Sequence, residues 1–158
     1  MIGTRRLVRG VVVATLGCTL LLPAVPAGAA ATTLQAALSG GGTEVPDPGD
    51  PDGSGGAVVK VDVKKQKVCY TLVVLDITLP TAAAHIHEGE AGVAGPIAVT
   101  LKAPQEIAGT GIGLATGCAK DQPKPLLRDI RRNPDRYYIN VHTADFPGGA
   151  VRGQLELA

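Results

Sequence analysis

Apolar and polar residues alternate with a period of two in several short segments of this chain. The segment 57–63 is the clearest, because alanine and valine occupy one set of alternate positions while Lys60 and Asp62 fall between them. Successive side chains of a strand point to opposite faces, so this pattern is typical of strands with one face against a core. Clusters of glycine, proline and aspartate separate the segments and end each one after a few residues. The sequence therefore predicts a fold of many short strands.

Strand patterns or apolar strand-length runs recur at 33–38, 57–63, 68–75, 82–87, 97–101, 112–115, 136–143 and 150–157. The stretch 47–56 is dense in turn formers and predicts an exposed loop. Pro123 and Pro125 open the only expected helix, which carries apolar residues on one side and ends by Asn133. We expect an all-β fold: an antiparallel Greek-key sandwich or barrel of about seven to eight strands, with one short helix in a crossover. The last two segments are expected to pair as a hairpin.

The first 29 residues have the pattern of an export signal. Three arginines precede the apolar stretch 11–22, which is short for a bilayer span, and Ala27-Gly28-Ala29 fits a cleavage site. We predict a signal peptide at 1–29 and one β domain at 30–158, with no membrane span in the mature chain. Cleavage after Ala31 and an uncleaved anchor are the alternatives. The predicted location is outside the cell or in its envelope.

Two cysteines remain once the predicted signal, which contains Cys18, is removed. In an oxidising compartment Cys69 and Cys118 most simply form a disulfide. A two-cysteine metal site is the alternative, although neither cysteine belongs to a close pair such as C-x-x-C.

The charge of the mature chain is close to neutral. Removing the three signal arginines from 15 basic residues leaves 12, against 14 acidic residues. No run of basic residues indicates a nucleic-acid or anionic-lipid partner.

All three histidines take the same kind of position. His85 and His87 flank Ile86 and therefore share one face of a predicted strand, away from the core. His142 shares the outward face of a later predicted strand with Asn140. Two interpretations stay open: a cluster that binds a metal, or polar residues on strand faces that hold loops through hydrogen bonds.

Arg152 is predicted to join this face, because a hairpin of 150–157 with 136–143 places it beside Asn140 and His142. Its guanidinium has five donors in a fixed fork, which suits it to clamping the carbonyl groups of an adjacent loop. Asn140 and Arg152 are therefore expected around the histidines rather than as ligands. The alternative is a solvated strand arginine with no specific role.

Several separated motifs follow one another along the chain. They are Leu38-Ser39-Gly40, Glu44-Val45-Pro46, Ala84-His85-Ile86-His87 with Gly89, Gly92, Gly95 and Pro96, Tyr138 to Thr143, Pro147-Gly148-Gly149 and Arg152-Gly153-Gln154-Leu155. In type and order these motifs resemble those of the CHRD domain, first described as repeats in chordin. The resemblance covers essentially the whole mature chain. It implies a secreted single-domain protein and assigns no reaction.

A weaker similarity concerns the copper-zinc superoxide dismutases. That family carries two copper ligands as His-x-His on one strand and another on a later strand, which His85, His87 and His142 resemble in type and order. Arg152 likewise resembles that family's active-site arginine. The sequence departs from the family because it has no fourth histidine to bridge copper to zinc and none left for a zinc site.

These observations leave three functions to weigh. The first is a secreted, non-catalytic β domain that binds copper or zinc through His85, His87 and His142. The second is an extracellular module that binds another protein and uses its histidines only structurally. The third is redox catalysis at bound copper, the one catalytic option left, because no nucleophile motif, phosphate-binding loop or paired carboxylates stand out.

Overall fold

The computed structural model of the chain describes residues 31–158. The predicted signal peptide at 1–29, with Cys18, lies outside the described residues. The elements are β1 (Thr32–Ser39), η1 (Gly41–Thr43), β2 (Ser54–Asp62), β3 (Lys67–Leu75), β4 (Ala83–Glu88), β5 (Ile97–Leu101), β6 (Gln105–Glu106), β7 (Gly113–Ala119), α1 (Lys124–Arg132), η2 (Pro134–Arg136), β8 (Tyr137–His142), β9 (Val151–Gln154) and β10 (Glu156–Leu157).

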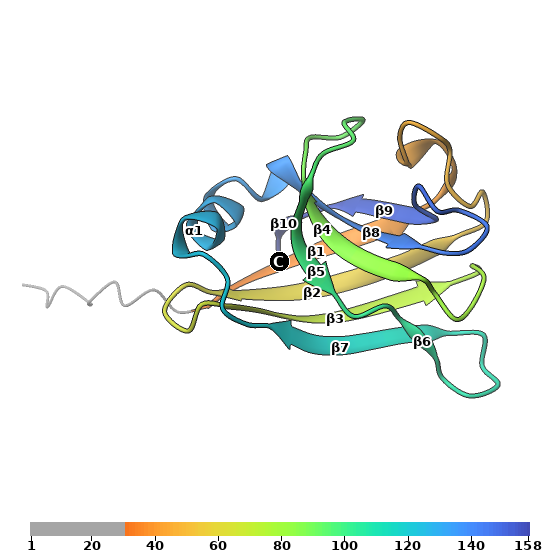
Figure 1. Ribbon diagram of the computed structural model, residues 1–158, viewed down its shortest axis with the longest axis horizontal. Helices are drawn as coiled ribbons and strands as arrows, with labels where there is room; N and C mark the ends of the chain where they lie inside the picture. Colours follow the sequence, from red (N-terminus) through yellow and green to blue (C-terminus); the bar gives the residue numbers. More distant parts are fainter. Residues whose placement is uncertain (1–30) are drawn as a thin grey trace, which may run out of the picture.

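All strands belong to one antiparallel sheet with the order β5-β4-β8-β9-β1-β2-β3-β7-β6, and β10 pairs with β1. The sheet curls on itself into a half-barrel, so that β5 at one edge comes into contact with β7 near the other (Figure 1). The backbone N–H of Lys102, just after β5, donates to Tyr70 Oη on β3 over 2.7 Å and links the two sides. Within residues 31–158 the all-β class and the single α-helix are confirmed, with ten strands rather than seven to eight.

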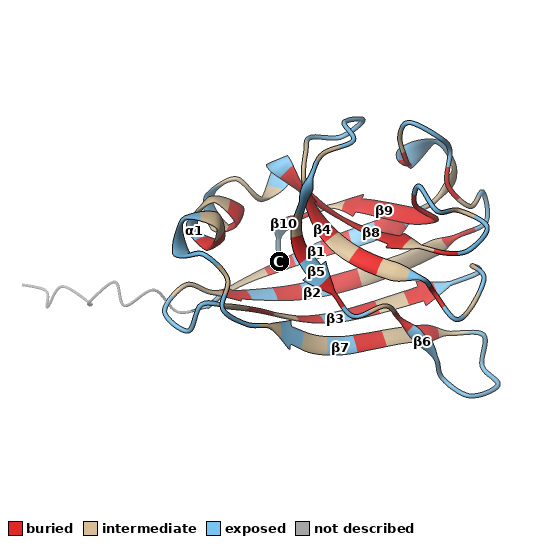
Figure 2. Ribbon diagram, viewed as in Figure 1, coloured by how far each residue is buried: buried red, intermediate tan, exposed pale blue. Residues whose placement is uncertain are grey.

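The concave face of the sheet holds the core, as the alternation predicts. On β2 the residues Ala57, Val59 and Val61 are buried, whereas Val58 and Lys60 point outward. Figure 2 shows buried positions running along the inner strands and onto one side of α1. Leu127 and Ile130 of that helix are fully buried, so α1 closes one end of the curled sheet.

The predicted hairpin is only half correct. β9 pairs with β8, as expected, but β10 pairs with β1 instead. The break falls at Leu155, whose side chain is buried and whose N–H donates to the carbonyl of Tyr137 over 2.8 Å. The alternating pattern of 150–157 continues through this break, so periodicity alone predicts a single strand.

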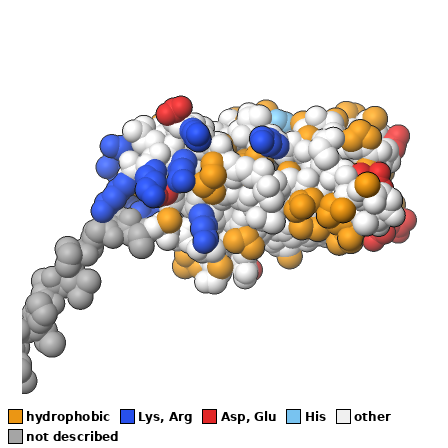
Figure 3. All heavy atoms as spheres, turned by 90° about the horizontal axis from the view of Figure 1, so that it is seen from below, with side chains coloured by type: hydrophobic (Ala, Val, Ile, Leu, Met, Phe, Trp, Pro, Cys, Tyr) orange, Lys and Arg blue, Asp and Glu red, His pale blue; other side chains and the backbone are white. Residues whose placement is uncertain are grey.

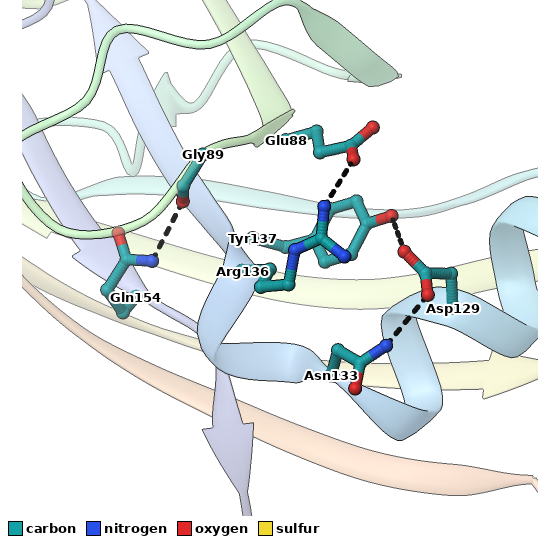
Figure 4. Close-up of polar contacts among 7 residues, drawn as sticks. All are labelled: Glu88, Gly89, Asp129, Asn133, Arg136, Tyr137 and Gln154. Atoms are coloured by element: carbon teal, nitrogen blue, oxygen red, sulfur yellow. Dashed lines mark hydrogen bonds and ion pairs between the residues drawn. The ribbon is translucent and has the colours of Figure 1, made fainter.

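Hydrogen bonds fix α1 to the sheet next to it. Tyr137 Oη donates to Asp129 over 2.6 Å, and Asn133 donates to the other oxygen of the same carboxylate over 2.8 Å (Figure 4). These two bonds hold the pKa of Asp129 below its usual range. The helix therefore keeps a fixed place beside the start of β8.

Cys69 and Cys118 form the predicted disulfide. They are directly opposite each other in the β3–β7 pairing, with their side chains on the outer face of the sheet. The side chain of Cys69 therefore forms part of the outer face of β3. Within residues 31–158, no helix has the length and apolar character needed to cross a membrane.

Candidate metal centre

The three histidines lie together on the outer face of β4 and β8. In the register of these strands, His85 is opposite Asn140, His87 is opposite Tyr138 and His142 is opposite Ala83. The prediction that each histidine lies on the outward face of its strand is therefore confirmed, and the pairing of the two strands brings the three into one cluster.

The histidine cluster, His85, His87 and His142, is compact enough to present nitrogen atoms to a common point. Each residue offers one ligand nitrogen, and these three atoms lie within 4.8 Å of one another. His85 Nδ1 and His142 Nε2 are 3.2 Å apart. The His85 ring stands nearly perpendicular to that of His87, with their centroids 5.5 Å apart.

Two backbone carbonyls decide where the protons of the cluster reside. His87 Nδ1 is 2.8 Å from the carbonyl oxygen of Gly95, and His142 Nδ1 is 2.9 Å from that of Pro147. A carbonyl only accepts, so both Nδ1 atoms must carry the proton. In a neutral ring this leaves Nε2 with its lone pair, the state in which imidazole binds a metal.

The loop that supplies the first carbonyl folds back closely over β4. A Cβ on Gly95 would overlap the carbonyl oxygen of Glu88, so only glycine fits there. The N–H of Gly95 also donates to Tyr138 Oη over 3.2 Å. Tyr138 in turn stacks on the His87 ring, with centroids 4.8 Å apart and planes within 8°. The ring of His87 is thereby held on one face and at one nitrogen.

His87 Nε2 is the most informative atom of the cluster. The residue is 8 % exposed, and its Nε2 is buried with no hydrogen-bond partner among the described residues. Buried polar atoms nearly always find a partner, and leaving one without costs about 1–3 kcal/mol. A cation among the three rings would give this lone pair a partner.

The surroundings also favour neutral rings. Burial is the main cause that lowers the pKa of His85, and the neighbouring His142 and His87 add to it. Burial likewise lowers the pKa of His142, against the opposing effect of its bond to Pro147. A lower pKa means that fewer protons compete with a metal near neutral pH.

The cluster is reached from solvent through a shallow pocket of about 260 Å³. His85, His142 and Pro147 line it, together with Ala82, Ala83 and Thr143. His85 and His142 are only partly buried, unlike His87. An ion held by the three rings would therefore have one side open to water or a small ligand.

Arg152 clamps the β4–β5 loop, as its position predicts. It lies opposite Asn140 in the β8–β9 pairing and donates to the carbonyl oxygens of Val93 and Glu90 over 2.9 and 2.8 Å. Its guanidinium carbon lies 3.3 Å from the centroid of the Tyr138 ring. The alternative of a solvated arginine is wrong, because the residue is 3 % exposed. Arg152 therefore stacks on one side chain, Tyr138, which itself stacks on His87. Its contact with the histidine cluster is indirect.

Gln154 makes a second clamp on the same loop. Its side-chain amide donates to the carbonyl of Gly89 over 3.0 Å (Figure 4) and to that of Asp135 over 2.7 Å. In the same view, Arg136 donates to Glu88 over 3.2 Å at the surface. Glu88, although next to His87 in sequence, therefore points to Arg136.

Glu44 is the buried residue whose role the sequence does not reveal. It is 4 % exposed and packs against Gly149, where a Cβ would overlap its carboxylate. Burial raises its pKa to about 7, although the charge of Arg152 and hydrogen bonds from Val45 and Asn140 act in the opposite direction. Its Oε1 and Asn140 Oδ1 are both buried without a partner among the described residues. Glu44 belongs to a motif of the family resemblance, but sequence alone does not show that its loop folds inward.

Comparison with known proteins supports the resemblance seen in the motifs. Searches of curated proteins and of solved structures returned no match, so the similarity to copper-zinc superoxide dismutases stays a prediction. The model of the CHRD domain matches residues 34–155, which span the strands, the disulfide and the histidine cluster described above. Because this match covers most of the chain, from β1 to the residue before β10, the protein belongs to the CHRD domain family.

Proposed function

We propose that this protein is an exported β module that binds a transition metal ion, copper or zinc, through His85, His87 and His142. The observation that carries the proposal is the buried, unpartnered Nε2 of His87, beside two further imidazole nitrogens within 4.8 Å. The CHRD family is extracellular, and the disulfide fits an oxidising compartment.

The spacing of the nitrogens supports this reading. Metal–nitrogen bonds of about 2.0–2.1 Å place two ligand nitrogens of a tetrahedral or trigonal site about 3.4 Å apart. His85 Nδ1 and His142 Nε2 are already at 3.2 Å, and the widest separation in the set is below 4.8 Å. Closing the site needs shifts of about 1 Å, which partly exposed rings can make by rotation.

The ligand set selects among metals by its chemistry. Three neutral imidazoles suit zinc and copper, whereas calcium and magnesium prefer oxygen ligands. The carbonyls of Gly95 and Pro147 would act as the outer partners that orient His87 and His142. Three protein ligands leave a further coordination position, on the side of the pocket at His85 and His142.

The alternative is that the histidines only hold loops and that the module binds another protein. The bonds to Gly95 and Pro147, and the contact between His85 and His142, are what such a role requires. It leaves the lone pair of His87 Nε2 without a function, which is why we favour metal binding. We assign no turnover to the centre.

Isothermal titration of the exported, untagged protein with Cu(I), Cu(II) and Zn(II) tests the proposal. His87→Asn is the informative variant, because its amide can still donate to Gly95 while the position of Nε2 is lost. Glu88→Gln is the matched control, since Glu88 is adjacent in sequence but pairs with Arg136.

We expect stoichiometric uptake of copper or zinc by the wild type and by Glu88→Gln, and a loss of at least tenfold in affinity for His87→Asn. Electron paramagnetic resonance of the Cu(II) form should report nitrogen ligands. No uptake of any of these ions by correctly folded protein would refute metal binding. Capture of a protein partner that survives a chelator and His87→Asn would favour the interaction module instead.

A further inference from the structure

The positive charges of the described chain are concentrated at one end of the half-barrel. Of the twelve lysines and arginines in residues 31–158, nine fall in the segments 60–67 and 119–133, which contain only three carboxylates. Figure 3 shows most of the blue side chains gathered at this end and most of the red ones toward the opposite end. We call these two segments together the basic end; its cations are Lys60, Lys64, Lys65, Lys67, Lys120, Lys124, Arg128, Arg131 and Arg132.

The fold assembles this surface from parts that are distant in the chain. The N–H of Gln122 donates to the carbonyl of Gln66 over 2.9 Å, which joins the β2–β3 turn to the segment before α1. Ala119 lies opposite Val68 in the β3–β7 pairing. Most of the cations are exposed, and those of α1 lie on the side opposite the buried Leu127 and Ile130. Lys64, Lys65 and Lys67 are close together in sequence, but they join the cations of 119–133 only in the folded protein.

The rest of the described chain has the opposite charge. Outside the basic end, residues 31–158 contain three lysines or arginines and eleven carboxylates. A strand the length of β2, nine residues, spans about 30 Å, and the Debye length at physiological ionic strength is about 8 Å. Salt therefore screens the charges of the acidic end from a surface that touches the basic end. The acidic end does not cancel the attraction between the basic end and an anionic surface.

We propose that the basic end docks on a membrane surface rich in anionic phospholipids. The charges are spread over a turn and a helix, which suits contact with many headgroup phosphates at once. Neither segment contains an aromatic residue, so the surface lacks the stacking platform that single-stranded nucleic acids need.

The start of β1 lies at the same end. Arg131 Nε donates to Thr32 Oγ1 over 2.7 Å, and Thr32 is opposite Val61 in the β1–β2 pairing. The β domain therefore begins at the basic end, and docking through this end directs the acidic end away from the bilayer.

The test is co-sedimentation of the exported protein with vesicles of phosphatidylcholine, alone or mixed with phosphatidylglycerol. Mass spectrometry first establishes the N-terminus of the exported protein. Lys64→Glu changes an exposed turn residue of the basic end. Lys102→Glu is the matched control, because it makes the same charge change at an exposed site outside the basic end. A double variant, Lys64→Glu with Arg128→Glu, samples both segments.

We expect binding only to the anionic vesicles, loss of binding at about 0.5 M salt, and at least fivefold weaker binding for Lys64→Glu. The double variant should lose binding, whereas Lys102→Glu should bind like the wild type. Equal binding to both kinds of vesicle, no binding at low salt, or equal losses for Lys64→Glu and Lys102→Glu would overturn the proposal. Binding to soluble polyphosphate without binding to vesicles would also overturn it and assign the basic end to a soluble polyanion.

Discussion

Replacing Glu44 with glutamine should remove a pH-dependent loss of stability. The carboxyl is buried, and burial raises its pKa from 4.5 to about 7. A raised pKa means that the folded state holds the proton more tightly than the unfolded state does. The stability that comes from keeping Glu44 protonated in the folded state is therefore fully present below about pH 4.5 and is lost as the pH rises through about 7. Glutamine resembles the protonated carboxyl in shape and stays neutral throughout.

The magnitude follows from the two pKa values. The difference between 4.5 and about 7 corresponds to about 3 kcal/mol, at about 1.4 kcal/mol per pKa unit. Part of this cost arises because Glu44 Oε1 has no hydrogen-bond partner among the described residues. Above pH 7 the variant should therefore be more stable than the wild type by up to about 3 kcal/mol, and near pH 4 the two should agree within about 1 kcal/mol.

The assay is urea unfolding of both proteins, with the disulfide intact and metal removed, across this pH range. His85 and His142 also titrate, and their lowered pKa values make stability fall as the pH falls. Both proteins contain these histidines, so the difference in free energy of unfolding isolates Glu44. A difference that stays constant within about 0.5 kcal/mol from pH 4 to 8 would refute the reasoning.

Three further substitutions test separate parts of the structure. Arg152→Lys keeps the charge but loses the fork that holds the β4–β5 loop, so it should lower the free energy of unfolding by more than about 1 kcal/mol; a loss below about 0.5 kcal/mol would contradict the clamp. Cys69→Ser should lower it by about 4 kcal/mol in denaturant titrations, because the disulfide closes a separation of 49 residues, and mass spectrometry should find no free thiol in the wild type. Tyr137→Phe should cost about 1.5 kcal/mol and raise the pKa of Asp129, which a carboxyl NMR titration would show; an unchanged Asp129 pKa would exclude the bond.

Local pattern predicts the strands well where one face meets the core and the other meets solvent. The predicted segment 97–101 coincides with β5, and 68–75 differs from β3 by one residue. Prediction is weakest where the chain changes strand partner within a regular pattern, as after Leu155, or where glycines replace the apolar residues, as at the start of β2. In these places a neighbouring strand decides the hydrogen bonding, and that neighbour is distant in sequence.

The site was predictable to the extent that it depends on strand faces. The period of two places His85 and His87 on one face, and it places Asn140 with His142 on another strand. That these strands are adjacent depends on sheet order. Burial of His87 depends on the glycine-rich loop folding back at Gly95; the glycines indicate a turn, but not that the turn covers His87. Asn140 illustrates the limit, because the pattern places it with His142 whereas its side chain hydrogen-bonds to the buried Glu44.

Local periodicity and residue chemistry are enough to predict the β class, the one short helix of residues 31–158, the disulfide partners and the residues that share a face. The convergence of three imidazole nitrogens, the burial of Glu44 and the assembly of the basic end follow only from the tertiary structure. Each of these brings together segments tens of residues apart. Such contacts depend on sheet order and loop packing, which are set by the free energy of the whole chain rather than by any one segment.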